Sequence, residues 1–216
     1  MNYKPIFDSV NKWEFEGFED QDVILICCSW GRDLVDGELI YFMNTDNNYD
    51  ISNINNKNNN LDHLRKPVTK AIDEWDYRLE GISFTETSSK QHADIEIHFR
   101  EDHNVGAGMT KNYYDGYRFI TKSYVVITKG SFGFGFGFSD NQIEQIVKHE
   151  IGHVLGLGHA NFDGNLMTTQ VNYGSGVIQI VKLMQCIKLM IGGLKWVMEK
   201  VAIVTWITFI IQNLNT

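Results

Sequence analysis

The segment HEIGHVLGLGH, residues 149–159, sets the expected fold and chemistry of this chain. On an α-helix, residues four apart lie on one face with their Cβ atoms ~5–6 Å apart. His149 and His153 have this spacing and can therefore bind one metal ion together. Glu150 would lie beside that ion, where a carboxylate can take a proton from water and deliver it to a leaving amine. The segment thus predicts two metal ligands and a general base on one helix.

The second half of the segment supplies a third ligand, His159. In a continuous helix His159 would lie on the wrong face to join His153. Gly156 solves this, because glycine adopts positive φ without a Cβ penalty and can end the helix and turn the chain back. Three protein ligands leave one coordination position open, which is typical of a catalytic zinc site. We therefore predict one catalytic Zn²⁺ and hydrolysis of peptide bonds.

A capping signal places the start of this helix. Ser139 and Gln142 have the spacing of a capping box. An apolar face with helical periodicity follows, formed by Ile143, Ile146, Val147, Ile151, Val154 and Leu155. The pattern predicts a helix from near Asp140 to near Gly156, with the metal-binding residues in its second half.

HExxHxxGxxH is the metzincin signature, and the chain resembles the matrixin branch of that clan. The resemblance implies an α+β zincin catalytic domain, in which a twisted, mostly parallel sheet carries an active-site helix and a Met-turn. Met167 follows His159 at a distance that fits the Met-turn, and it would be a structural residue beneath the zinc rather than a ligand. The implied activity is that of a zinc metalloendopeptidase.

The resemblance extends upstream and covers roughly residues 64–176. Residues 68–75, VTKAIDEW, resemble the first matrixin helix, and residues 82–86 and 93–99 resemble the strands that follow it. The chain departs from animal matrixins in two respects. We see neither their histidine and aspartate pattern for structural zinc and calcium nor a cysteine-switch propeptide.

Three further histidines, His92, His98 and His103, match no ligand template. We expect them to be ordinary surface or strand residues, and the alternative is a second zinc site.

Upstream, residues 22–28 and 38–43 are predicted to be strands, either as a small N-terminal hairpin or as the first strand of the catalytic sheet. Pro67 suits the first turn of the helix that follows. That helix would have an apolar stripe and a glycine cap, formed by Val68, Ile72, Trp75, Leu79 and Gly81.

Residues 105–110, VGAGMT, are predicted to form the edge strand that pairs with substrate, because glycines let another backbone approach closely. Gly106, Ala107 and Gly108 are the predicted substrate-binding residues, and a plain turn is the alternative. Residues 118–128 are predicted to form a further strand. The run SFGFGFGFS, residues 131–139, would cover the sheet as a loop, with an assembly role as the alternative.

Composition restricts the partners. The 216 residues carry a net charge of −8, which argues against nucleic acid as a partner. Cys27, Cys28 and Cys186 form no disulfide framework, so we expect buried or free thiols. No signal peptide is visible, although most metzincins act outside cells, so the compartment stays open.

We divide the chain into N-terminal strands with an Asn-rich linker (1–60), a matrixin-like peptidase domain (61–176) and an aberrant apolar tail (177–216). The apolar part of the tail, residues 201–211, is shorter than the ~20 residues that a transmembrane helix needs. One hypothesis is that the tail is read out of frame, which the gene's DNA would decide. The other is that it binds membrane surfaces as an amphipathic helix.

The sequence therefore predicts a zinc metalloendopeptidase with a polypeptide substrate. Two alternatives stay open: a zinc-binding pseudo-enzyme, and a membrane-surface or assembly module driven by the tail and the Phe-Gly run. Cleavage preference and oligomeric state are not predicted.

Overall fold

The computed structural model describes residues 24–30, 37–44, 62–79, 81–100, 106–117, 119–128, 137–162 and 164–169. The Asn-rich segment 45–60, most of the Phe-Gly run, the tail 177–216, His103 and Cys186 lie outside these residues.

A five-stranded sheet forms the centre of the structure, with the strands in the order β3-β2-β4-β6-β5. Its strands are β2 (Glu38–Asn44), β3 (Ser83–Thr87), β4 (Ile95–Arg100), β5 (Gly108–Tyr114) and β6 (Ile120–Thr128). β5 is an edge strand and is antiparallel to β6, whereas the other pairs are parallel. The architecture is thus α+β with a mostly parallel sheet, as predicted.

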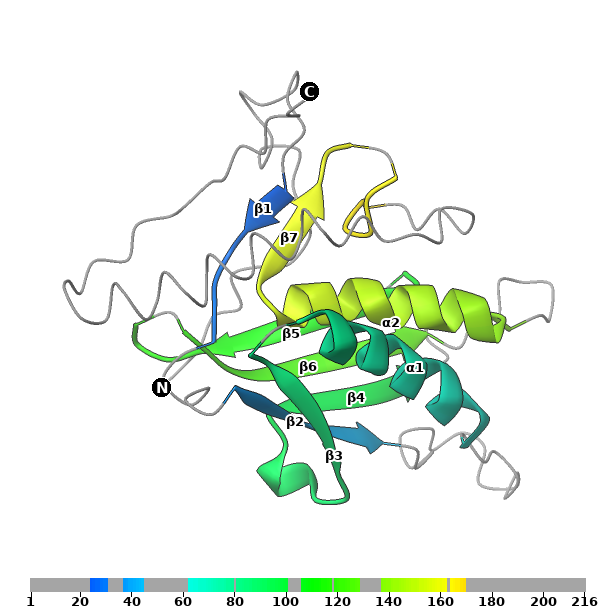
Figure 1. The fold of residues 1–216 in the computed structure, drawn as a ribbon, viewed down its shortest axis with the longest axis horizontal. Coiled ribbons are helices and arrows are strands. Elements are labelled where there is room, and N and C mark those ends of the chain that lie inside the picture. Colours follow the sequence, from blue (N-terminus) through cyan, green and yellow to red (C-terminus); the bar gives the residue numbers. More distant parts are fainter. Residues whose placement is uncertain are drawn as a thin grey trace.

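Two helices, α1 (Asp62–Arg78) and α2 (Asp140–Val154), lie on one face of the sheet and pack against each other (Figure 1). A 3-10 helix, η4, spans Lys90–His92. A separate antiparallel pair joins β1 (Ile24–Ile26) to β7 (Leu157–Ala160), just beyond the end of α2. No helix in the described part of the chain is long and apolar enough to cross a membrane.

The core lies between the helices and the sheet. Ile95 and Ile97 of β4 are fully buried. Ile151 of α2 is also fully buried, and Ile146 of α2 is 1% exposed. Each buried aliphatic side chain contributes ~1.5–3 kcal/mol relative to its exposed state. Trp75 of α1 lies in the same core, so the apolar stripes of both helices are buried as their periodicity predicts.

The capping box of α2 is present as predicted. The Ser139 side chain accepts from the Gln142 N–H, and the Gln142 side chain accepts from the Ser139 N–H. The helix ends at Val154, and Gly156 has a φ of +91°.

The prediction for Pro67 was wrong. α1 begins at Asp62, so Pro67 lies inside the helix rather than in its first turn. The apolar stripe extends one turn further back than expected, because Leu64 is only 3% exposed. Its burial favours the added turn although Pro67 has no N–H to donate within the helix.

The strand predictions hold with shifted boundaries, but the alternative of an N-terminal hairpin was wrong, because β1 pairs with β7 and not with β2. Residues 38–43 belong to the five-stranded sheet, where β2 lies between β3 and β4. The edge strand begins at Gly108 rather than at residue 105, because Gly106 has a φ of +74° and turns the chain before pairing starts. Gly106 and Ala107 therefore lie before the strand. The two alternatives for this segment are both present, since the chain turns at Gly106 and the edge strand starts at Gly108.

The expectation of free or buried thiols at Cys27 and Cys28 was wrong, because these adjacent residues are joined by a disulfide. The Cys28 sulfur also lies 3.3 Å from the Tyr114 hydroxyl of β5.

Candidate metal centre and catalytic site

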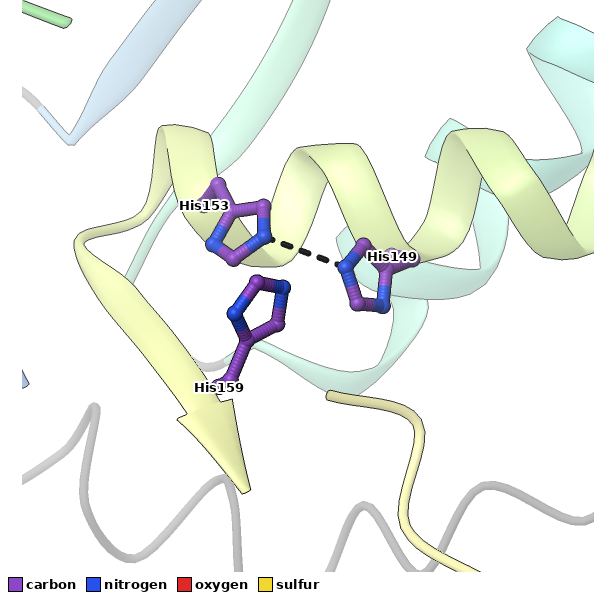
Figure 2. Close-up of side chains that lie close together, drawn as sticks. All are labelled: His149, His153 and His159. Atoms are coloured by element: carbon purple, nitrogen blue, oxygen red, sulfur yellow. Dashed lines mark hydrogen bonds between the residues drawn. The ribbon is translucent and has the colours of Figure 1, made fainter. Parts of the chain in front are cut away.

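Helix α2 and strand β7 bring the three motif histidines to one place. His149 and His153 lie one turn apart near the end of α2, and His159 comes back from β7 (Figure 2). Their ligand atoms all lie within 4.8 Å of one another. Gly156 makes the return possible, because a Cβ there would overlap the carbonyl oxygen of Cys28 as well as oppose the positive φ.

Backbone carbonyls fix the proton position on two of these rings. His149 Nδ1 lies 2.7 Å from the Leu166 carbonyl oxygen, and His153 Nδ1 lies 2.7 Å from the Leu157 carbonyl oxygen. A carbonyl only accepts hydrogen bonds, so Nδ1 carries the proton in each neutral ring. The lone pairs of both rings are therefore on Nε2.

These two Nε2 atoms lie only 3.1 Å apart, the contact drawn in Figure 2. With both protons on Nδ1, neither Nε2 can donate to the other, so the neutral rings direct two lone pairs at one another. A cation between them would convert this repulsion into coordination.

All three rings are held neutral. Burial, together with His149 and His159, lowers the pKa of His153 to about 3. Burial and His149 lower the pKa of His159 to about 4, and burial lowers the pKa of His149 although its hydrogen bond to Leu166 opposes the shift. Neutral imidazole is the form that binds metals.

The donor set fits zinc. Three imidazole nitrogens at ~2.0–2.1 Å from an ion form a typical catalytic zinc centre with one open position. The 3.1 Å between the Nε2 atoms of His149 and His153 is compatible with both nitrogens binding one ion. In addition, His159 Nδ1 is buried without a hydrogen-bond partner among the described residues.

Glu150 lies beside this centre and is 4% exposed. Its Oε2 accepts a 2.6 Å hydrogen bond from the Thr110 hydroxyl of β5. Burial raises the pKa of Glu150 to about 7, and the Thr110 hydrogen bond acts in the opposite direction. A carboxyl group with a pKa near neutrality can both accept and return a proton, as a general base and acid must.

Met167 lies under α2 and is fully buried. A Cβ at Gly152 of α2 would overlap the Met167 sulfur, so the absence of a side chain there lets the methionine approach the helix. The Met167 carbonyl accepts from the Ala160 N–H at 2.7 Å, and its N–H donates to Asn165 Oδ1 at 2.8 Å. The bond from Ala160 links the methionine to β7, the strand that carries His159.

The predicted residues fall into two groups. The ligand atoms of the three histidines lie together, and Gly108 lies against Glu150, the residue after His149, because a Cβ at Gly108 would be 2.5 Å from Glu150 Oε1. Gly106 is exposed with open space around it, and Ala107 precedes the edge strand.

Sequence reasoning missed two residues of β5. Thr110 contacts Glu150, and Asn112 Nδ2 donates to the His153 carbonyl at 2.8 Å. The available signal was period-2 alternation from Gly108, which places these side chains on one face of a strand.

His92 and His98, the other histidines whose side chains the structure describes, lie outside the centre. His98 is buried on β4, where its Nε2 lies 3.1 Å from Glu96 Oε2 and its ring stacks on Tyr124. His92 is exposed in η4. Within the described residues, the only group of three or more potential ligands is the His149, His153 and His159 set.

Comparisons with known proteins agree with this geometry at the level of the family. No curated protein matches the chain. Among solved structures, the GM1-bound form of the ECX AB5 holotoxin has 19% identity and a TM-score of 0.45, covering 76% of this chain and 80% of that one. A TM-score of 0.45 is too low to infer a shared fold or function from this structure. The family model for matrixin, peptidase family M10, matches residues 41–182. The chain belongs to the matrixin family.

Proposed function

We propose that this chain is a zinc-dependent endopeptidase in which His149, His153 and His159 bind the ion and Glu150 is the general base. The family supports a peptidase. The observation that carries the proposal is the pair of unprotonated Nε2 atoms 3.1 Å apart, beside a buried carboxyl group and a third, half-buried imidazole.

A zinc ion bound by three imidazoles acidifies water and polarises a substrate carbonyl. Glu150 removes the proton from the attacking water as the new C–O bond forms at the scissile carbonyl carbon. Its carboxyl group then delivers that proton to the amide nitrogen as the C–N bond breaks. Burial of Glu150 favours this second role, because its raised pKa makes the protonated form accessible near neutral pH.

Substrate would bind in extended form along β5, an edge strand of the sheet. Gly108 lies next to Glu150 and has no side chain to obstruct a second backbone. Gly106 and Ala107, just before the strand, would extend this substrate-binding segment. Substrate placed there would have its scissile bond close to the Glu150 carboxylate.

Met167 would serve as the Met-turn residue. It is fully buried beneath Gly152, and the adjacent Leu166 carbonyl accepts from His149. Its role would be to support the ligand-bearing turn of α2 by packing, without binding the ion.

The test is cleavage of fluorescein-labelled casein by the purified, zinc-supplied chain, with Glu150→Gln and a chelator as controls. We expect one zinc ion per chain, cleavage abolished by the chelator, and a rate at least ~10²-fold lower for Glu150→Gln. Glu150→Gln should still bind zinc, because the glutamate is not a ligand. A folded, zinc-loaded chain that cleaves nothing would contradict the proposal and indicate a zinc-binding protein without turnover. A folded chain that binds no zinc would contradict the metal site itself.

A further inference from the structure

Three alternating side-chain positions of β5 face α2, and we call them the β5 contact row: Gly108, Thr110 and Asn112. Thr110 binds Glu150, and Asn112 binds the carbonyl of His153. Asn112 is itself held by Ser123 of β6, whose hydroxyl donates to Asn112 Oδ1 at 2.7 Å. The row therefore contacts α2 at the turn that carries both the carboxyl group and a metal ligand.

Thr110 contacts Glu150 twice. Its Oγ1 lies 2.6 Å from Oε2 and 3.1 Å from the Glu150 carbonyl oxygen. A hydroxyl group has one proton, and the shorter contact has the length of a charge-assisted O–H···O⁻ bond, ~2.5–2.7 Å. The side chain of Thr110 is itself restrained, because a β-branched residue has restricted χ1 freedom.

The two oxygens of Glu150 consequently differ. Oε2 is occupied by Thr110, whereas Oε1 accepts no hydrogen bond from the described residues and lies toward Gly108. A carboxylate fixed at one oxygen presents the other in a constant direction. Without the hydroxyl group, the buried Oε2 would lose its donor and the carboxylate could rotate away to find another.

We propose that Thr110 is a positioning residue that orients the Glu150 carboxylate, holding Oε2 so that Oε1 faces the reacting water. The proposal rests on the proposed peptidase function and adds to it a residue from outside the zinc motif. The contact spans 40 positions of the sequence and belongs to the strand that would also bind substrate.

The test compares Thr110→Val, which keeps the shape and removes the hydroxyl group, with Thr110→Ser, which keeps the hydroxyl group. Thr121→Val of β6 is the matched control, because among the described residues its hydroxyl group bonds only the Tyr113 carbonyl. Steady-state cleavage of labelled casein gives kcat and KM, metal analysis gives the zinc content, and thermal unfolding gives the stability.

We expect Thr110→Val to lower kcat by ~10–10²-fold, because misplacement of a catalytic group costs rates of this order. KM and zinc content should stay within twofold of the wild-type values. Thr110→Ser should recover at least a third of the wild-type kcat, and Thr121→Val should leave it unchanged. A wild-type kcat for Thr110→Val would overturn the proposal, as would a loss that accompanies lost zinc or that serine fails to recover.

A second readout works without turnover. Acetohydroxamic acid can chelate zinc and donate a hydrogen bond to an adjacent carboxylate, so its affinity for the zinc-loaded chain reports the orientation of Glu150. We expect Thr110→Val to weaken this affinity about tenfold, with Thr110→Ser and Thr121→Val within twofold of wild type. Equal affinities for all four proteins would overturn the positioning role. Absence of casein cleavage by the wild type, with the affinity pattern intact, would instead contradict the peptidase function alone.

Discussion

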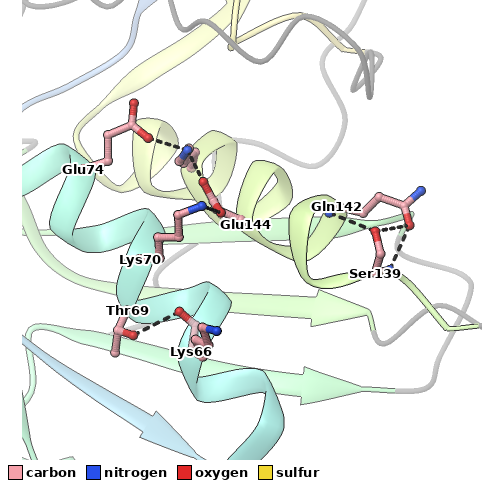
Figure 3. Close-up of polar contacts among 8 residues, drawn as sticks. Lys66, Thr69, Lys70, Glu74, Ser139, Gln142 and Glu144 are labelled. Atoms are coloured by element: carbon pink, nitrogen blue, oxygen red, sulfur yellow. Dashed lines mark hydrogen bonds and ion pairs between the residues drawn. The ribbon is translucent and has the colours of Figure 1, made fainter.

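Helix α2 is held from two sides, and the two sides use different interactions. On the α1 side, an ionic cluster of Lys70, Glu74, Glu144 and Lys148 joins the helices (Figure 3). Lys148 is 3% exposed and pairs with both Glu74 and Glu144, while Lys70 reaches the second oxygen of Glu144 at 2.6 Å. The Trp75 indole adds a 3.0 Å hydrogen bond to the Lys148 carbonyl.

On the β5 side the donors are neutral. Thr110 and Asn112 donate to Glu150 and to the His153 carbonyl, and Gly108 contributes only space. A formal charge on this side would act directly on Glu150 and on the neutral histidines, because electrostatic interactions are strong in a buried environment. Charged pairs thus secure the helix on its α1 side, whereas neutral hydrogen bonds on its β5 side hold Glu150, the candidate general base. Variants on the α1 side should therefore change stability, and variants on the β5 side should change turnover.

The largest effect should come from Lys148→Ala. In the variant Glu144 retains Lys70 and Glu74 retains Arg78. Because both carboxylates keep one partner, we expect a loss below the ~3–5 kcal/mol that leaving an unpaired buried charge costs. Urea unfolding should show this loss, and the folded fraction should retain kcat within a few-fold. The double variant Lys148→Met with Glu144→Leu should recover most of the stability, since it leaves no uncompensated charge on α2. An unchanged unfolding free energy for Lys148→Ala would refute the ionic role of the α1 side.

Gly108→Ala tests the β5 side. The new Cβ would lie 2.5 Å from Glu150 Oε1 and would displace the carboxylate. We expect kcat to fall by up to ~10²-fold, because small misplacements of reacting groups cost this much. Zinc content should be retained. Gly116→Ala in the β5–β6 turn is the matched control, since nothing lies within 4 Å of its added Cβ. Equal kcat for both variants would show that Glu150 tolerates displacement.

Asn112→Ala should have a smaller effect. It removes the donor to the His153 carbonyl and the acceptor of the Ser123 hydroxyl. The expected loss is ~1 kcal/mol per hydrogen bond, measured by thermal unfolding. Zinc affinity should fall several-fold because the turn that carries His153 loosens. A variant with wild-type stability and zinc affinity would leave Thr110 as the only member of the row with a positioning effect.

The smallest effect is a difference in acid sensitivity. Burial would raise the pKa of Glu144, but its pairs with Lys148 and Lys70 lower it overall from 4.5. A carboxylate with a lowered folded-state pKa contributes stability that is present above its unfolded pKa and is lost as pH falls through the folded value. Unfolding between pH 5 and 3 should therefore show a steeper loss of stability for the wild type than for Glu144→Gln. Parallel pH profiles would indicate that the ionic cluster contributes little to acid stability.

Local patterns anticipated α2 well. The capping box, the apolar face and the positive φ of Gly156 involve residues a few positions apart, and each was confirmed in the structure. Pro67 shows where such patterns fail, because burial of Leu64 extends α1 beyond a residue that locally favours the first turn. The start of β5 failed for a related reason: its register is set by pairing of Gly108 with Ile127, far along the chain.

By itself, the sequence determined the candidate ligands and the candidate general base, because helix geometry puts His149 and His153, four residues apart, on one face, with Glu150 one position further along the helix. Only the tertiary structure decided how Glu150 is surrounded. Thr110 and Asn112 come from a strand 40 or more positions away, and their contacts depend on how β5 packs against α2. No periodicity within a single element encodes such a contact, because it exists only once the sheet and the helix have packed together.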